Sequence, residues 1–558
     1  MKRRISSLMT AAVLFIFAAT ACNLPISGLG KGAAAPNVQG EPLTKFTPTV
    51  LVTPTPAFQG VWIQPSLPIG ILNAIGNIQV QDAADADSAS LVLKDTANAE
   101  GSGTLIAQST WIYALAAPFF TVRDGVTLEQ LEQIWRGNSP TDLTGIQLAM
   151  EESTRATFAA RWGDASSANV VTKPAGELAP AESVWVIIPF EEIKPAEKVL
   201  KIDGLSPLDK PLAVENYPLK ATFGLFQAAE TDAATLAIAE QLKVQLPLTN
   251  RDESRMTVLI MSGTTAMTRA TAFKIDTKGI DYVISGMKDW FLAADLRHVS
   301  NEVSFSADCP KPDPNTSSMR FCSNPAYIDV LKGLGINIVE LTGNHENDYG
   351  PENFAQSVQT YLDLGWTIFG GGLTPEDARK PALVESNGNK IAFIGCNPVG
   401  PTNAWVTDSH AGVARCDPDY YYGQIRQLKQ QGYVVIATFQ HQEIYKYMYD
   451  DFYKTDFRKA AESGADIVSG AQAHFPMGFE LSGNSLIHYG MGNFLFDQMD
   501  YPVVGTKREF VDRHIIYDGR YINTELLTAM LTDYSRPRPM TDEERTQFLT
   551  DLFTASQK

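Results

Sequence analysis

Short apolar runs alternate with amphipathic stretches along the second half of the chain. The stretch 351–364 places Phe354 and Val358 on one helical face, and Pro351 suits the first position of a helix. Alternation of strand-length runs with helical stretches predicts a layered α/β domain. The apolar runs are 257–261, 336–341, 367–369, 390–394, 433–438, 465–468 and 485–489.

A first α/β region precedes this domain. Residues 111–118 predict a buried strand or helix segment, and 185–189 predict another strand. Thr127 and Gln130 have the spacing of a capping box, which opens a helix that ends near Gly137. We therefore expect a folded region over 60–252.

The N-terminus has the layout of a processing signal. Lys2, Arg3 and Arg4 precede the apolar stretch 8–20, which is too short to span a bilayer, and small residues then lead to Cys22. This layout resembles the bacterial lipoprotein signal, in which the cysteine is lipidated. The alternative is a plain secretory signal with a chance cysteine. Either reading implies an extracytoplasmic protein, and the first adds a membrane anchor.

The predicted organisation has five parts. Residues 1–22 are the signal, and the Pro- and Thr-rich 23–59 cannot bury a core and form a linker. The first α/β region covers 60–252, the layered domain covers 253–535, and 536–558 form a polar tail. With 558 residues, the chain is too long for one domain of about 150 residues.

Charge and cysteine content narrow the functional classes. The formal net charge is −18, which argues against nucleic-acid binding and requires a local basic or metal-centred pocket for any anionic substrate. Beyond Cys22 the sequence has four cysteines, and an exported protein favours disulfides. Three pairings exist. Cys309 with Cys322 is the preferred one because both flank a Pro-rich loop, and Cys396 with Cys416 follows by default.

Polar residues of catalytic type follow the predicted strands of the second domain. Four of the 7 histidines, His345, His441, His474 and His488, lie in such positions. In open α/β sheets the strand ends carry the chemistry, so we expect these four to line one pocket. Imidazole, carboxylate and amide groups together favour a divalent ion of the Mn, Fe, Zn or Mg type.

The segment 122–137 resembles the hinge-proximal part of periplasmic substrate-binding proteins, those for phosphate in particular. The stretches 189–193 and 202–204 fit the same family loosely. No Ser/Thr/Gly anion-binding loop is recognisable. A working receptor and a binding-protein fold kept as a structural module both remain open.

The second domain resembles the CapA family of poly-γ-glutamate capsule-synthesis proteins, which share the calcineurin-like metallophosphoesterase fold. The resemblance covers roughly half the chain, and its motifs run in the family's order. The matching positions are 263–269, Asn301 and Glu302, the Asn-His-x-x-Asp-x-Gly signature at 344–350, His441, 472–474 and 492–494.

The resemblance implies roles for individual residues. His345 and Asp348 become the catalytic acid pair. The metal-ligand candidates are Glu302, Asn344, His441 and His474, and the substrate-binding candidates are Arg269, Asn301 and Asn493.

Two positions depart from the family's pattern. Thr264 replaces a metal-binding aspartate, and Gln472 replaces the first histidine of a His-x-His pair. Both exchanges remove charge or basicity, so we expect at most one metal site.

Two functions follow. The first is a membrane-tethered, metal-dependent hydrolase or transferase that acts on capsule or another cell-surface polymer. Its partners would be this polymer or the machinery that synthesises it. The alternative is a non-catalytic surface module with a degraded metal site that binds polymer or a partner. Neither reading defines an oligomeric state.

Overall fold

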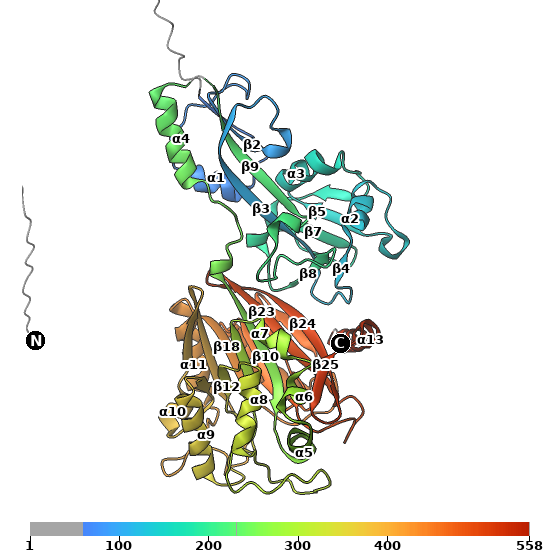
Figure 1. The fold of residues 1–558 in the computed structure, drawn as a ribbon, viewed down its shortest axis with the longest axis vertical. Coiled ribbons are helices and arrows are strands. Elements are labelled where there is room, and N and C mark those ends of the chain that lie inside the picture. The colour runs from blue at the N-terminus through green and yellow to red at the C-terminus, as the bar shows by residue number, and fades with distance from the viewer. Residues whose placement is uncertain (1–59, 230, 557–558) are drawn as a thin grey trace, which may run out of the picture. The chain divides into compact units, whose positions relative to one another are not determined.

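Two α/β regions carry the predicted alternation of strands and helices (Figure 1). The computed structural model describes residues 60–229 and 231–556. Cys22, the signal and the 23–59 linker lie outside these residues. Within the described part of the chain, no helix has the length and apolar character needed to cross a membrane.

The first region is built on a nine-stranded mixed sheet of order β1-β2-β9-β3-β7-β5-β6, with β8 pairing β3 and β4. The predicted capping box is confirmed. The Thr127 side chain accepts the backbone N–H of Gln130, and the Gln130 side chain accepts the backbone N–H of Thr127. The strands are β1 (Val61–Ile63), β2 (Leu91–Asp95), β3 (Thr104–Pro118), β4 (Gly125–Val126), β5 (Gln147–Met150), β6 (Val170–Thr172), β7 (Val184–Pro189), β8 (Glu197–Ile202) and β9 (Lys220–Gln227). The helices are α1 (Ile69–Ile75), α2 (Leu128–Trp135), α3 (Glu152–Trp162) and α4 (Ala233–Gln245).

The second region contains two larger sheets. An eight-stranded sheet has the order β13-β12-β11-β10-β23-β24-β25 with β22 beside β10, and a six-stranded sheet has the order β15-β16-β18-β19-β21-β20. The strands are β10 (Met256–Thr265), β11 (Leu296–Asn301), β12 (Ile338–Glu340), β13 (Thr367–Phe369), β14 (Gly371–Gly372), β15 (Ala382–Ser386), β16 (Asn389–Cys396), β17 (Gly412–Val413), β18 (Val434–Gln440), β19 (Ile467–Ala471), β20 (Phe479–Ser482), β21 (Ser485–His488), β22 (Asn493–Leu495), β23 (Arg508–Tyr517), β24 (Arg520–Thr532) and β25 (Arg536–Pro539). The helices are α5 (Arg269–Lys278), α6 (Ile280–Ile284), α7 (Lys288–Leu292), α8 (Ile328–Gly333), α9 (Pro351–Asp363), α10 (Pro375–Arg379), α11 (Pro418–Gln430), α12 (Asp451–Glu462) and α13 (Asp542–Ser556).

The two sheets pack face to face, with helices on their outer faces. In β10, Leu259 and Met261 join side chains of the six-stranded sheet in one core, whereas Val258 and Ile260 join α5, α6 and α9 in another. Burial on both faces explains why these strands read as continuous apolar runs. The predicted mixed α/β class is confirmed.

Both preferred disulfides are confirmed. Cys309 bonds to Cys322 and Cys396 bonds to Cys416. Each pair closes a short loop that follows a strand of the second region, so each restrains chain close to the strand ends.

The segment after residue 535 differs from the predicted polar tail. Strand β25 pairs with β24, and α13 buries Phe548, Leu549 and Leu552 in the core between the sheets. The charged residues of α13 conceal this apolar face in the sequence, because the buried side chains are grouped at the end of the helix. The segment is structurally part of the second region.

Replacing Leu549 by alanine should therefore lower the free energy of unfolding by about 2–5 kcal/mol, because Leu549 is fully buried. Thr550→Ala alters an exposed neighbour on the same helix and should leave stability nearly unchanged. Urea unfolding of both variants measures the difference. Equal stabilities would show that α13 is not part of the core.

Candidate functional site

The parallel strands of the eight-stranded sheet bring several predicted residues to one edge. Thr265 of β10 lies opposite Asn301 of β11, and Thr264 lies opposite Asn493 of β22. Val303, just beyond β11, forms a bridge with His345. The loops after β10, β11 and β12 and the start of β22 thus meet, as expected for strand ends that carry chemistry.

Glu302 has a buried carboxylate without hydrogen-bond donors. Its side chain is 1% exposed, and neither oxygen has a hydrogen-bond partner among the described residues. The Nε2 atom of His474 lies 4.0 Å from Glu302 Oε1. A buried carboxylate is costly unless a cation or donors compensate its charge, so this pair marks a place for positive charge.

Asn493 and Phe496 hold the imidazole of His474 in place. Its Nδ1 lies 2.7 Å from Asn493 Oδ1, and its ring stacks on Phe496 at 4.7 Å. If Nδ1 carries the proton, Nε2 presents its lone pair toward Glu302, the state in which histidine binds a metal. Asn493 is fully buried and orients His474; its predicted contact with substrate stays a prediction.

His345 and Asp348 form the predicted pair. His345 Nδ1 lies 2.7 Å from Asp348 Oδ2, and the same oxygen accepts the backbone N–H of Phe321 at 2.8 Å. Burial lowers the pKa of His345, but the bond to Asp348 and the charge of Glu302 outweigh it, so the pKa lies above its ordinary value. His345 Nε2 makes no hydrogen bond among the described residues. The raised pKa favours the protonated imidazole, the form in which Nε2 can act as a proton donor.

Three amides and a hydroxyl occupy the neighbouring strand ends. Gln440 donates to Asn344 Oδ1 at 3.3 Å and also to Gln472 Oε1. The hydroxyl of Thr264 is buried and has no hydrogen-bond partner in the described part of the chain. Gln440 was not among the predicted site residues, although it follows the predicted strand 433–438; its position as the last residue of β18, one strand away from Gln472, is the signal that identifies it.

Glu346 adds a second buried acid behind the turn. Burial raises the pKa of Glu346 to about 8, against a lowering bond from the Ser304 hydroxyl at 2.7 Å, and the charge of Glu302 raises it further. A protonated Glu346 at neutral pH avoids a second uncompensated charge beside Glu302. It was not among the predicted residues.

The other predicted substrate contacts have structural partners. Arg269 bonds to Asp497 through Nε at 3.1 Å and through a second nitrogen, and it lies over the ring of Phe321. Asn301 is fully buried and donates to Val303 O and to the hydroxyl of Tyr361. A direct contact of either residue with substrate stays a prediction.

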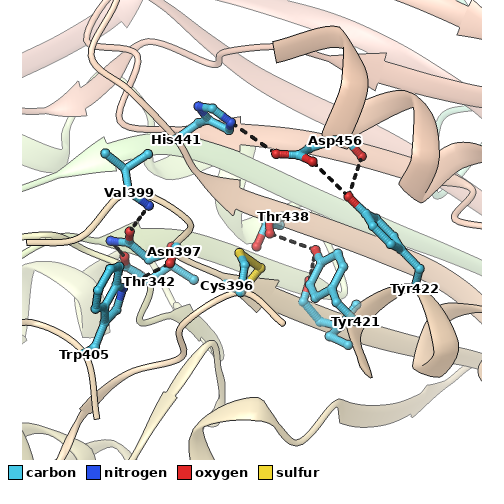
Figure 2. Close-up of a disulfide and its surroundings, with 12 residues drawn as sticks. Thr342, Cys396, Asn397, Val399, Trp405, Tyr421, Tyr422, Thr438, His441 and Asp456 are labelled. Carbon is cyan, nitrogen blue, oxygen red and sulfur yellow. Dashed lines mark hydrogen bonds and ion pairs between the residues drawn. A yellow bond between two sulfur atoms is a disulfide. The ribbon is translucent and has the colours of Figure 1, made fainter. Parts of the chain in front are cut away.

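His441 makes its contacts with α12. Figure 2 shows its Nε2 directed at Asp456, 3.4 Å away, and its ring packs on Tyr453 at 4.2 Å. Its Nδ1 is buried and finds no hydrogen-bond partner among residues 60–229 and 231–556. No contact joins it to Glu302 or His474 within the described residues, so its role as a ligand stays a prediction.

The Cys396–Cys416 disulfide supports the chain beside the turn at 342–350. Asn397, next to the disulfide, donates to Thr342 O at 3.0 Å and accepts the backbone N–H of Val399 at 3.0 Å (Figure 2). The Trp405 indole donates to Asn397 O at 3.1 Å. These bonds fix the loop after β16 against the loop that carries His345.

The expectation that four histidines line one pocket is wrong for His488. Its Nδ1 lies 2.6 Å from Asp512 Oδ2, and its ring packs against Phe479 and Phe510 between the sheets. Its neighbour Leu486, two positions earlier on β21, points into the same core. His488 is therefore a core residue with a buried partner.

The donor set fits one cation better than two. Over residues 60–229 and 231–556, no group of three or more His, Cys, Asp or Glu side chains could hold a metal ion. Glu302 and His474 supply one carboxylate and one imidazole, and Asn344 stays a predicted neutral oxygen donor. Two adjacent divalent ions need more negative charge than this set provides.

Comparison with known proteins agrees with the predicted family resemblance of the second domain. Residues 258–498 match the family model for bacterial capsule synthesis protein PGA_cap. PGA biosynthesis protein CapA of Bacillus subtilis is 24% identical over 226 residues, 40% of this chain and 59% of that protein. Capsule biosynthesis protein CapA of Bacillus anthracis is 24% identical over 267 residues, 45% of this chain and 62% of that protein. The similarity to bacterial capsule synthesis proteins thus lies in residues 258–498, and the chain spans less than two thirds of the length of these two relatives.

Solved structures resemble the two regions weakly. A phosphate transport receptor from Vibrio cholerae covers 31% of this chain and 86% of its own, at 15% identity and a TM-score of 0.26. The NAD nucleotidase of Haemophilus influenzae covers 54% of this chain and 56% of its own, at 11% identity and a TM-score of 0.30. Likeness at these scores carries no argument about function.

Removing the Glu302 charge should abolish metal binding without unfolding the protein. We expect Mn²⁺ to raise the melting temperature of the wild type, and Glu302→Gln to remove this shift, because the variant loses the one carboxylate at the pair. Metal-free Glu302→Gln should be at least as stable as the metal-free wild type, since an uncompensated buried charge is gone.

Glu509→Gln is the matched control. Glu509 is equally buried, neither of its oxygens has a hydrogen-bond partner within the described structure, and burial alone holds its pKa well above the ordinary value. This variant should keep the Mn²⁺-dependent shift. Thermal unfolding with and without Mn²⁺, together with elemental analysis, tests both variants. A full shift in Glu302→Gln would exclude Glu302 as a ligand.

Proposed function

We propose that the protein is a CapA-like surface protein that synthesises or processes capsule polymer of the poly-γ-glutamate type as a metal-dependent hydrolase or transferase. The observation that carries this proposal is the His345–Asp348 pair beside the uncompensated carboxylate of Glu302. The family match and the two disulfides support action outside the cytoplasm. Cys22, if lipidated, tethers the protein to the membrane.

The side chains divide the chemistry among them. Asp348 orients His345 through Nδ1, and its hydrogen bond and charge favour the imidazolium, whose Nε2–H can give a proton to a leaving group. Glu302 and His474, with Asn344, would hold one divalent cation, which polarises a carbonyl or phosphoryl oxygen. Asn493 keeps His474 in position, and Gln440 does the same for Asn344.

A second candidate function is non-catalytic polymer binding. The specific observation in its favour is the neutral set at the strand ends, where Thr264, Gln440 and Gln472 hold no charge. Such a site recognises polymer or a partner without reacting, and the first α/β region then supplies further ligand capture. Measurement of turnover separates the two functions.

His345→Ala should lower turnover of a γ-linked glutamate polymer by about 10²–10⁴-fold with little change in KM, because general acid catalysis is lost and substrate contacts remain. Asp348→Asn should lower turnover less, since the imidazole stays in place without the carboxylate charge. Release of new polymer ends over time is the measurement.

His410→Ala removes a histidine that lies outside the strand ends and bonds only to a main-chain oxygen among the described residues, and it should retain wild-type turnover. Equal turnover in His345→Ala and wild type would exclude His345 as the acid. A wild type that binds the polymer but never cleaves or transfers it would favour the binding module.

A further inference from the structure

A cavity of about 270 Å³ lies next to the candidate site, in the loop closed by the Cys309–Cys322 disulfide. Its walls come from this loop, from the start of α5, and from Tyr327 and Tyr349. Cavities of this size suit a small group or one segment of an extended chain. Neither the proposed acid nor the proposed metal ligands line it.

Two uncompensated cations face this cavity. Lys311 is exposed and makes no hydrogen bond or ion pair with any described residue. Arg320 donates to the main-chain oxygen of Asp348 at 2.7 Å and lies 4.9 Å from the Tyr349 ring, so its partners carry no opposing charge. The chain as a whole has a net charge of −18, so two such cations in the lining of one cavity form a locally positive surface.

The remaining polar groups of the lining are mainly donors. Thr316 Oγ1 accepts from the Ser318 backbone and Ser318 Oγ accepts from the Arg320 backbone, both at 3.2 Å, which leaves the two hydroxyl hydrogens for a ligand. Asp313 is the one carboxylate that lines this cavity in the described structure, and its Oδ1 accepts the Asn315 backbone at 2.9 Å. The lining therefore favours an anion over a cation.

Two consecutive residues, Arg320 and Phe321, link the cavity wall to the proposed acid pair through their contacts. Phe321 donates its backbone N–H to Asp348 Oδ2, while Arg320 holds Asp348 O from the cavity side. The Phe321 ring lies 4.4 Å from His345. A chain bound in the cavity would thus contact Arg320, whose neighbour Phe321 contacts both members of the His345–Asp348 pair.

We propose that the disulfide-closed loop 309–322 is a subsite for an anionic polymer, in which Lys311 and Arg320 bind the free carboxylates of the segment next to the reacting bond. The proposal rests on the proposed function, since it specifies how that same site takes its substrate. The loop supplies positive charge that the strand ends lack, and the disulfide keeps both cations on one wall. Binding weakens as salt concentration rises.

Titration calorimetry of the purified folded protein with a short γ-linked glutamate oligomer tests the subsite. Lys311→Glu should weaken Kd by at least about tenfold, because it removes one attraction and adds a repulsion. Lys390→Glu makes the same charge change at an exposed position on the β15–β16 hairpin and should bind as the wild type does. His345→Ala should also retain wild-type Kd.

The outcomes separate the subsite from the proposed function. If the wild type binds the oligomer and Lys311→Glu binds it equally well, the subsite is wrong and the polymer function stands. If the wild type binds no oligomer, both the subsite and the polymer class are overturned. Binding of inorganic phosphate with a Lys311-dependent Kd, in place of the oligomer, would assign the cavity to a different anion and overturn the proposal.

Discussion

Burial of β10 and β18 on both faces is the constraint on which the second region depends. Leu259 and Met261 of β10 and Ile436 of β18 fill the core between the sheets, while the alternate side chains pack against the outer helices. A strand so enclosed cannot shift its register without moving apolar side chains into the wrong layer. The strand ends are therefore fixed in space, and so are the starting points of the loops that follow them.

The site that results has an imbalance of charge. The buried carboxylate of Glu302 has no hydrogen-bond partner among the described residues, and the Nε2 atom of His474 lies 4.0 Å from it. Glu346 has a pKa of about 8, so it keeps its proton near neutral pH and adds no second negative charge beside Glu302. One bound cation would compensate Glu302. Such an ion and the cations of the 309–322 loop are also what a polyanionic substrate requires of an acidic protein.

Sequence reasoning located the seven strands that it named in the second region, the capping box at Thr127 and the disulfides, because these follow from periodicity, local geometry and cysteine count. It missed the long strands β23 and β24. It also located His345 with Asp348, since three positions in one turn suffice to bring them together. It did not foresee that His488 lies in the core, that His441 bonds to α12, or that Gln440 meets Asn344. Those outcomes depend on the direction in which each side chain points at the end of its strand, and tertiary packing determines that direction.

The most direct test of this account is a crystal structure of the ectodomain soaked in Mn²⁺, with anomalous scattering measured at the manganese edge. The account predicts one anomalous peak in the second region, within bonding distance of both Glu302 and His474. Two peaks of similar height would show that the site holds a pair of metals. No peak at Glu302 would contradict the claim that its buried carboxylate is compensated by a cation.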